Sequence, residues 1–230
     1  RKGRLEAVYC LKDMREFDEN KGTSHGEYVE GIGVQDVERG AIGQIKGLPW
    51  QSDTCIGGWF YNQFLEYKTA RCVIQLLADV VSKNGNLLLN FPLRGEGTLD
   101  EPSLEVVNAL GAWMSVNGEA IHDTRPWVRF GEGPTSSEGG LFTEQERPYT
   151  SEDFRFTAKG DTLYAIMLGW PANGKTAITS LTPDHGQVAA VKMLGAAERP
   201  QWTQKGDGLH LRVPTEQPCE SAWVFRIELD

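Results

Sequence analysis

A helix that is followed at once by a buried strand is the feature that most constrains this chain. Residues 69–92 read TARCVIQLLADVVSKNGNLLLNFP. Thr69 can cap the start of the helix. Asn84 and Gly85 can end it, because both tolerate the left-handed conformation that a helix end needs. The predicted helix is amphipathic, and its apolar residues recur at helical spacing: Val73, Leu76, Leu77, Val80 and Val81.

The strand after this helix is an apolar run at residues 87–89, with no alternation of polar side chains. Such a strand is covered on both faces, as in parallel sheets and in barrels ringed by helices. A second helix is predicted next, because Asp100 can cap it and Pro102 suits its first turn. Residues 117–118, Asn-Gly, would end it. Its predicted inner stripe is Leu104, Val107, Leu110 and Met114.

Three earlier segments are typical of strands, and with the strand above they make four: residues 5–11, 31–37, 53–57 and 86–91. Four strands followed by a helix, with links of variable length, predict half of an eight-stranded (β/α)8-type barrel. Such a half would leave two open edges and an uncovered core. We therefore expect about half of the barrel to precede Arg1.

The chain changes character after residues 125–127. Short alternating runs then lie between turn signals such as Asn173-Gly174. Six or more strands at this spacing predict an antiparallel β-sandwich. Residues 131–140, rich in Gly, Ser and Glu, are expected to be a loop or linker. The predicted strands are 154–158, 162–168, 176–178, 188–191, 209–213 and 222–227.

The expected fold class is therefore α/β plus all-β. Residues 1–126 would form the barrel half, and residues 127–230 the sandwich. The chain has 230 residues and a net charge of −9, with no basic run. Nucleic acid and an anionic membrane surface are therefore not expected as partners. The four cysteines form no CxxC pair and the four histidines are scattered, so no metal or other cofactor is expected.

Several separated motifs carry a resemblance to a known family. They read DVERG, PWQSDTCIGGWFY, SKNGNLLLNFPLRGEGTLDE and WMSVNGEAIHDTRPW, and the match covers residues 5–127. In these motifs the chain resembles the end of the catalytic barrel of α-L-fucosidases of glycoside hydrolase family 29. It departs from the family at Glu96, where Asp is usual, and at His122, where Tyr is usual. The sandwich also fits, since family members carry one behind the barrel.

The resemblance implies a glycoside hydrolase: a retaining exo-α-L-fucosidase that removes terminal fucose through a covalent fucosyl-enzyme intermediate. The implied partners are a fucosylated oligosaccharide or glycoconjugate and the missing N-terminal half of the barrel. A periplasmic or secreted location is also implied. The family's nucleophile is an Asp near the end of an earlier barrel strand. No segment here matches that strand, so the nucleophile is expected upstream of this chain.

The carboxylates that could act on a sugar are few. A retaining glycosidase needs two carboxyl groups about 5 Å apart, and a βα barrel holds such groups at the carboxyl ends of its strands. Glu38 ends the second predicted strand and is the preferred acid/base, although Arg39 would favour its ionised form if the two paired. Glu66 is the alternative, since it lies in a loop where some family members carry their acid/base.

The remaining predicted site residues surround the third strand. Asp53 would bind sugar hydroxyls or orient a neighbour, and a structural role is the alternative because it is predicted to start the strand. Trp50, Trp59 and Tyr61 are predicted to bind substrate, because aromatic rings pack on the apolar face and C5 methyl group of fucose. Phe60 is expected in the core. The glycines before Trp59 would let backbone or ligand approach closely.

A second function is kept open, that of a non-catalytic carbohydrate-binding protein. Sandwich domains often bind sugars, and the chain lacks the family's nucleophile. This function would need an exposed row of aromatic side chains on the sandwich, including Trp170 or Trp202. The alternative for these two tryptophans is packing against the barrel.

Overall fold

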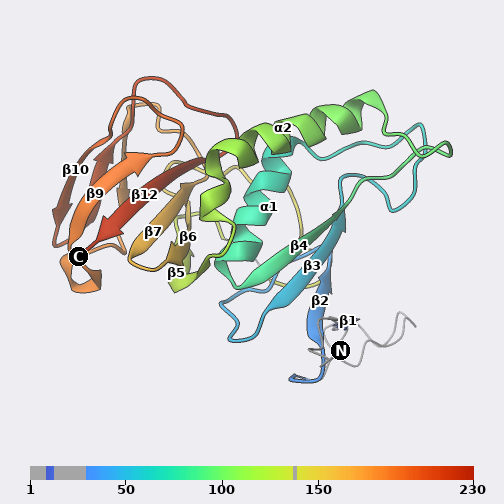
Figure 1. Ribbon diagram of the computed structural model, residues 1–230, viewed down its shortest axis with the longest axis horizontal. Helices are drawn as coiled ribbons and strands as arrows, with labels where there is room; N and C mark the ends of the chain where they lie inside the picture. The colour runs from blue at the N-terminus through green and yellow to red at the C-terminus, as the bar shows by residue number, and fades with distance from the viewer. Residues whose placement is uncertain (1–8, 13–29, 137–138) are drawn as a thin grey trace, which may run out of the picture.

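The first part of the chain is a four-stranded parallel sheet in the order β1-β2-β3-β4 (Figure 1). The computed structural model describes residues 9–12, 30–136 and 139–230. The strands are β1 (Cys10–Lys12), β2 (Val34–Glu38), β3 (Trp50–Cys55) and β4 (Gly85–Asn90). All four predicted strands are present, with β3 beginning three residues earlier than expected. Residues 5–8 of the first predicted strand lie outside the described residues.

Helix α1 (Ala70–Ser82) is the predicted first helix. Thr69 caps it, because its hydroxyl accepts a hydrogen bond from the Cys72 amide at 3.1 Å. Asn84 follows the helix with a φ of 71°, in the left-handed region that ends a helix. Both predictions made from the capping residues are confirmed.

Helix α2 (Glu101–Asn117) is capped by Asp100, as predicted, and the 3-10 helix η2 (Gly118–Ala120) follows it. The predicted inner stripe is right only in part. Leu110 and Met114 pack against the core, but Leu104 is 39% exposed and the fully buried helix residues are Ser103, Val106, Trp113 and Asn117. Trp113 sets the phase: its indole N–H donates to the Ala222 carbonyl of the second part at 2.8 Å.

Strand β4 is covered on one face only among the described residues. Leu87 and Leu89 pack beneath the helices, together with Val73 and Val106. Leu88 points to the opposite face and is 57% exposed. The expectation that this strand is covered on both faces is therefore not met within the described part of the chain, where the helices lie on one side of the parallel sheet.

The second part is a β-sandwich, as predicted. A five-stranded antiparallel sheet, β5-β6-β7-β12-β9, faces a three-stranded antiparallel sheet, β10-β11-β8. The first sheet comprises β5 (Arg125–Glu132), β6 (Phe154–Lys159), β7 (Thr162–Met167), β9 (Val188–Met193) and β12 (Trp223–Leu229). The second comprises β8 (Lys175–Ile178), β10 (Gln201–Lys205) and β11 (Gly208–Arg212), and the 3-10 helix η3 (Pro183–His185) precedes β9. Strands β5 and β10 were not predicted.

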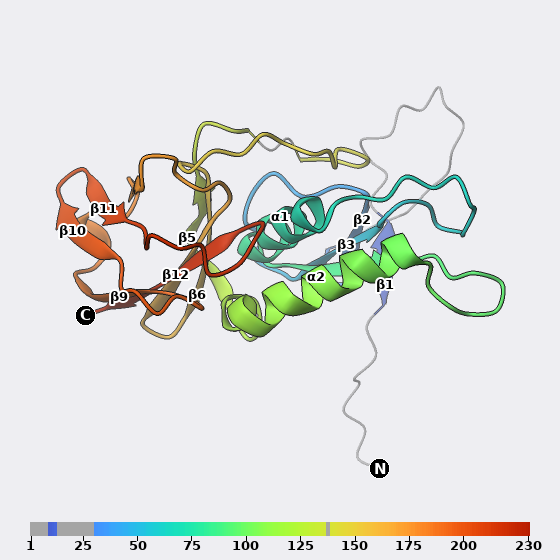
Figure 2. The same ribbon diagram turned by 90° about the horizontal axis from the view of Figure 1, so that it is seen from above.

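The two parts share a hydrophobic core. Ile74 and Ala78 of α1 pack with Trp113 of α2 against Ile166 and Val224 of the larger sandwich sheet. Figures 1 and 2 show α1 lying between the parallel sheet and the sandwich, with α2 running along the outer side of α1. The sandwich is therefore attached through the faces of the helices that turn away from the strands.

The segment between β5 and β6 is more than a linker. Residues 139–149 return to the first part, where Gly140 forms an isolated β-bridge with Ala41. We call residues 139–149 the strap. The loop predicted at residues 131–140 is thus divided between the end of β5, at Glu132, and the start of this strap.

Neither α-helix of the described part is both long and apolar enough to cross a membrane. The four cysteines are described and form no disulfide. Burial raises the pKa of the Cys72 thiol. It also raises the pKa of the Cys219 thiol.

Candidate active site

A lysine and three carboxylates meet on the open face of the parallel sheet. The Lys12 ammonium of β1 lies 2.5 Å from Asp53 Oδ1, 3.2 Å from Asp36 Oδ2 and 3.5 Å from Glu38 Oε2. Gln51 donates to Asp36 Oδ1 at 3.2 Å. The residues come from three neighbouring strands, so the parallel pairing itself brings them together.

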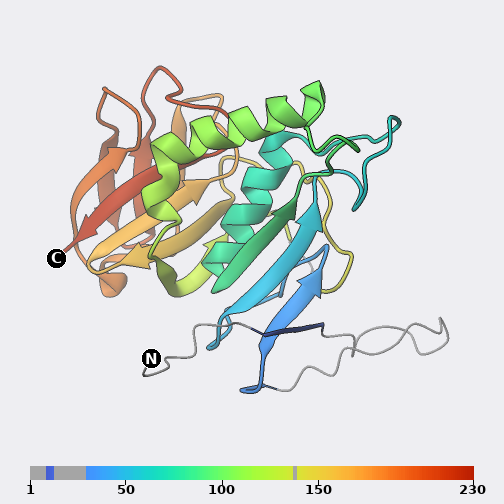
Figure 3. The same ribbon diagram turned by 45° about the vertical axis from the view of Figure 1, so that its right-hand side comes forward.

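The period of two along a strand explains this grouping. Asp36 and Glu38 alternate along β2, and Gln51 and Asp53 alternate along β3 beside them. Glu38 and Asp53 are partners in the register of the two strands. Figure 3 turns these strands toward the viewer. The charged cluster lies in the carboxyl-terminal half of the strands, where βα folds hold their ligands.

The electrostatics of the cluster are set by partial burial and by its excess of negative charge. Burial lowers the pKa of Lys12, but the hydrogen bond to Asp53 and the charge of Asp36 outweigh it, so the pKa of Lys12 is raised overall. Burial also raises the pKa of Asp53, and the nearby Asp36 and Glu38 add to this effect against the opposing Lys12. Asp53 therefore holds a proton more readily than an exposed aspartate.

The structure brings together two of the predicted site residues, Glu38 and Asp53. Asp53 is the fourth of six residues in β3, which corrects the expectation that it starts the strand. The Arg39 guanidinium does not pair with Glu38: its Nε donates to Glu144 Oε1 at 2.9 Å. Glu38 is thus turned toward the cluster, while its neighbour is held elsewhere.

Three of the other predicted residues, Trp59, Tyr61 and Glu66, lie in the loop after β3, residues 56–69. Trp59 is 38% exposed, Tyr61 is half-buried and Glu66 is exposed. The side-chain amide of Asn90 donates to the carbonyl of Trp59 at 3.4 Å, which ties the loop to the end of β4. The Arg94 side chain donates to the Tyr61 hydroxyl, and this bond raises the pKa of Arg94.

One expectation for this loop is wrong, and another is met by the protein's own backbone. Phe60 is 86% exposed and not in the core. The two glycines make room for the loop itself: a Cβ on Gly57 would lie 2.8 Å from the Tyr67 ring, and one on Gly58 would lie 2.9 Å from Leu65. The backbone also comes close, because the Glu66 carbonyl oxygen would lie 3.1 Å from a Cβ on Gly57 and the Phe60 carbonyl oxygen 3.3 Å from one on Gly58.

Trp50 belongs to the core and does not line the open face. It is 1% exposed, packs with Val37 and Val80, and donates its indole N–H to the Lys83 carbonyl at 2.9 Å. It points to the opposite face of β3 from Asp53, because their positions differ by an odd number. The prediction that Trp50 binds substrate is therefore wrong for this structure.

Lys12, Asp36 and Gln51 were missed from the sequence. The alternation of side chains along a strand could have indicated two of them. Asp36 is two residues before Glu38 and therefore lies on the same face of β2. Gln51 is likewise two residues before Asp53. Lys12 gave no such signal, because its place beside them depends on the pairing of β1 with β2.

No group of His, Cys, Asp and Glu suited to a metal ion occurs within residues 9–12, 30–136 and 139–230. The tryptophans of the sandwich form no exposed row. Trp170 packs against Trp223 with ring centroids 5.0 Å apart, and Trp202 packs against the same sandwich core. Both therefore pack within the sandwich and not against the parallel-sheet part, and the exposed aromatic row that a separate sugar-binding function required is not found there.

A βα barrel holds its catalytic groups at the carboxyl ends of its strands, and a pair of carboxylates is what a glycoside hydrolase needs, so the cluster fits that class of enzyme. Comparison with known families gives the particular one. The model described as "Alpha-L-fucosidase" matches residues 12–119, and that described as "Alpha-L-fucosidase C-terminal domain" matches residues 147–228. The chain belongs to the α-L-fucosidase family.

Curated relatives and solved structures agree. The alpha-L-fucosidase of Branchiostoma floridae is 32% identical over 161 residues, which are 68% of this chain and 32% of that protein. The human tissue alpha-L-fucosidase is 31% identical over 160 residues, 67% of this chain and 30% of that protein. The Thermotoga maritima alpha-fucosidase, solved in complex with fucose, matches with a TM-score of 0.66 at 25% identity, over 90% of this chain and 43% of that one. This chain thus spans about a third of the length of these curated relatives.

Proposed function

We propose that this chain is the part of a retaining exo-α-L-fucosidase that supplies its acid/base and one wall of its sugar pocket. The observation that carries the proposal is the meeting of Glu38, Asp53 and Lys12 on the open face of the sheet, in a chain of this family. The substrate would be a terminal α-linked fucose on an oligosaccharide or glycoconjugate. The enzyme would need no cofactor.

The parallel sheet is proposed to be the second half of a (β/α)8 barrel. Leu88 and the charged cluster would then face the barrel interior, which explains why this face is open among the described residues. β1 and β4 are the edge strands of this sheet and would pair with the N-terminal half. Residues 1–126 would form the catalytic part, and residues 127–230 the sandwich.

In the first step of the reaction, a carboxylate nucleophile attacks C1 of fucose and the bond from C1 to the leaving oxygen breaks. Glu38 gives its proton to that oxygen, so the leaving group departs as an alcohol. The product is a fucosyl ester of the nucleophile. We place the nucleophile outside this chain, on an earlier strand. Glu66 is the alternative donor of the proton.

In the second step, Glu38 takes a proton from a water molecule whose oxygen attacks C1. The ester bond to the nucleophile breaks, and fucose leaves with its original anomeric configuration. Glu38 ends the cycle protonated. Asp53 would bind a sugar hydroxyl, and Lys12 would hold Asp53 and Glu38 in place.

The loop after β3 is proposed to bind the sugar. Trp59 and Tyr61 lie beyond the carboxyl end of β3, and an aromatic ring there would cover the apolar face of fucose. The Thermotoga maritima neighbour was solved with fucose bound, which supports the same ligand here.

Hydrolysis of an aryl α-L-fucoside tests the function. The assay is run on this chain alone and on the full-length protein to which it belongs. If only the full-length protein is active, the result supports the proposal, including a nucleophile outside this chain. If this chain is active by itself, the placement of the nucleophile outside the chain is refuted. Absence of activity in both, with release of another sugar from its aryl glycoside, would refute the substrate.

A further inference from the structure

We propose that Glu144 of the strap is a positioning residue for this active site, holding the ends of β2 and β3 and the base of the sugar-binding loop from behind the sheet. The inference rests on the proposed function and adds a residue that lies 105 positions from Arg39, the side chain it holds. It positions the acid/base residue and does not contact the sugar.

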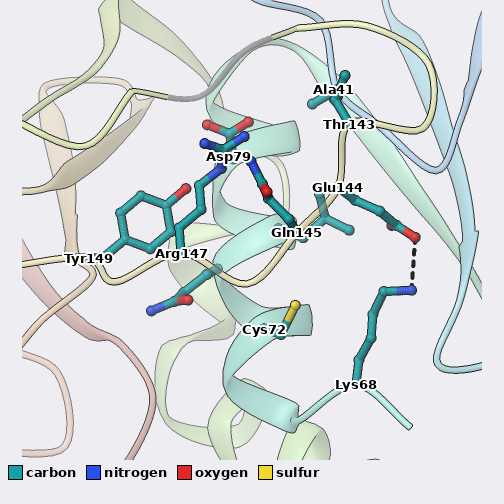
Figure 4. Close-up of a pocket in the computed structure, with 11 residues that line it drawn as sticks. Ala41, Lys68, Cys72, Asp79, Thr143, Glu144, Gln145, Arg147 and Tyr149 are labelled. Carbon is teal, nitrogen blue, oxygen red and sulfur yellow. Dashed lines mark ion pairs between the residues drawn. The ribbon is translucent and has the colours of Figure 1, made fainter. Parts of the chain in front are cut away.

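The Glu144 carboxylate gathers three donors from three segments. Its Oε1 accepts from Arg39 Nε at 2.9 Å and lies 2.8 Å from Lys68 Nζ, and its Oε2 accepts from Thr54 Oγ1 at 2.6 Å. Figure 4 shows Glu144 reaching from the strap toward Lys68 beside the first turn of α1. The side chain is only 5% exposed, so these bonds are shielded from water.

Glu144 is held as a charged carboxylate. Burial by itself would raise its pKa, but hydrogen bonds from Lys68, Thr54 and Arg39 outweigh burial and lower it. A buried carboxylate with three donors and two cations is a fully satisfied site. Removal of its charge would leave Arg39 and Lys68 without this partner.

The backbone of the strap reinforces the same connection. The Phe142 amide donates to the Glu38 carbonyl at 2.9 Å, and the Glu144 amide donates to the Arg39 carbonyl at 3.0 Å. The Gly140 amide donates to the Ala41 carbonyl at 2.8 Å. The strap therefore binds the main chain of the preferred acid/base itself, as well as that of Arg39 and Ala41.

The turn that the strap holds is strained. Arg39 has a φ of 48° and Phe142 a φ of 55°, in the left-handed region that side chains other than Gly seldom occupy. Such conformations persist when surrounding bonds enforce them, and they cluster at functional sites. Here the backbone hydrogen bonds described above join the segment of Arg39 to the segment of Phe142.

Glu144 works from the face of the sheet opposite the sugar. Thr54, its partner, is next to Asp53 in β3, so the two side chains point to opposite faces. Glu144 therefore has no path to the reacting atoms and acts through the residues it holds. This placement distinguishes a positioning residue from a catalytic one.

The third donor connects Glu144 to the loop that carries Glu66. Lys68 also donates its ammonium to the Cys55 carbonyl at 2.5 Å, and its amide donates to the Ile56 carbonyl at 2.6 Å. These bonds close the base of the loop after β3. Glu144 thus holds both candidates for the acid/base, Glu38 through Arg39 and Glu66 through Lys68.

The test replaces Glu144 by Gln in the full-length protein, with Glu146→Gln as the matched control, because Glu146 is an exposed carboxylate on the same strap. Each variant is assayed on two substrates. The leaving group of an aryl α-L-fucoside departs with little help from a proton, whereas the leaving group of a fucosyl oligosaccharide must be protonated as it departs. We expect Glu144→Gln to lower kcat/KM about tenfold more on the oligosaccharide than on the aryl fucoside, since a displaced acid/base loses proton transfer first. Glu146→Gln should leave both unchanged.

An equal loss on both substrates would overturn the inference, because a lower fraction of folded enzyme reduces every activity by one factor. No hydrolysis of either substrate by the unsubstituted protein would instead overturn the proposed function, and the role of Glu144 with it. Thr54→Val removes one hydrogen bond and keeps the shape, so it serves if Glu144→Gln fails to fold. It should change the same ratio by a smaller factor, and an unchanged ratio would count against the inference.

Hydrogen–deuterium exchange gives a readout that does not depend on activity. Glu144→Gln should speed amide exchange in residues 37–41 and 56–68, and Glu146→Gln should not. Unchanged exchange in both segments would show that Glu144 does not hold them.

Discussion

Arg155 of the sandwich donates through Nε to Asp79 of helix α1 at 2.5 Å, across the junction of the two parts. Lys83, one helical turn after Asp79, lies 2.6 Å from the other oxygen of the same carboxylate. All three side chains are at most 6% exposed. One buried carboxylate therefore contacts two buried cations, and it joins helix α1 beside the parallel sheet to the sandwich.

Replacing Asp79 by Asn should lower the free energy of unfolding by about 3–5 kcal/mol, because two buried cations lose their counter-charge. Urea denaturation of the full-length protein at pH 7 measures this. Asp123→Asn is the control, since Asp123 is 86% exposed in its pair with Lys159 and should change nothing measurable. Equal stability of Asp79→Asn and the parent would show that the triad does not stabilise the junction.

The same triad predicts a pH dependence. Burial raises the pKa of Asp79, but the charges of Arg155 and Lys83 outweigh burial and lower it overall. A carboxylate with a lowered folded pKa stabilises the protein above its unfolded pKa of about 4. That stability is lost as the pH falls through the folded value. The parent should therefore lose its advantage over Asp79→Asn below about pH 4, and a constant difference from pH 7 to pH 2 would contradict this.

Much of the fold was predictable from local patterns. Thr69 and Asp100 mark helix starts by capping chemistry, and Asn84 marks a helix end, all of which depend only on near neighbours. The phase of α2 was not predictable in this way, because Trp113 is drawn inward by the Ala222 carbonyl of the sandwich. A contact over 109 residues leaves no periodic signal.

Site residues could be predicted where their position within a single strand identified them, but not where contacts between several segments place them. Glu38 and Asp53 could be chosen from strand positions. Lys12 and Glu144 could not, because Lys12 contacts them only through the pairing of β1 with β2, and Glu144 contacts their neighbours Arg39 and Thr54 only through packing of a distant segment. Trp50 was wrongly assigned to the substrate site because the sequence does not show which face of its strand is covered by other parts of the chain.

Glu38→Gln should affect substrates according to their leaving groups. If Glu38 is the acid/base, kcat/KM on a fucosyl oligosaccharide should fall about 100-fold or more, whereas an activated aryl fucoside should lose far less. Glu66→Gln, made in parallel, tests the alternative. Equal activity of Glu38→Gln and the parent on the oligosaccharide would remove Glu38 from the role.

Lys12→Met should destabilise the protein at neutral pH by about 1 kcal/mol, because three carboxylates then face one another without a cation. The raised pKa of Lys12 means that its contribution is fully present below its unfolded pKa, so it is in force at pH 7. The loss should shrink toward pH 4, where Asp53, whose pKa is raised, takes up a proton. Melting temperatures from pH 4 to pH 8 would show this, and a loss independent of pH would indicate packing instead.

Trp59→Ala and Trp50→Phe should separate binding from stability. Trp59 is partly exposed in the loop after β3, so its loss should raise KM about fivefold, as expected for about 1 kcal/mol of ring contact, with little change in melting temperature. Trp50 is buried, so Trp50→Phe should lower the melting temperature and leave KM unchanged. A higher KM for Trp50→Phe alone would reverse the assignment of these two residues.

Gly40→Ala should disturb the strap at its closest approach. A Cβ on Gly40 would overlap the Gly140 carbonyl oxygen, at a separation of 1.9 Å from a backbone atom that has little freedom to move. The strap would have to shift away from the Glu38–Arg39 turn, at a cost of about 1–3 kcal/mol. Gly43→Ala is the matched control, since its Cβ would meet Gly139 at an ordinary 3.7 Å. We expect Gly40→Ala to lower both melting temperature and fucoside hydrolysis, and Gly43→Ala to lower neither; identical behaviour of the two variants would mean that the strap is not needed at this contact.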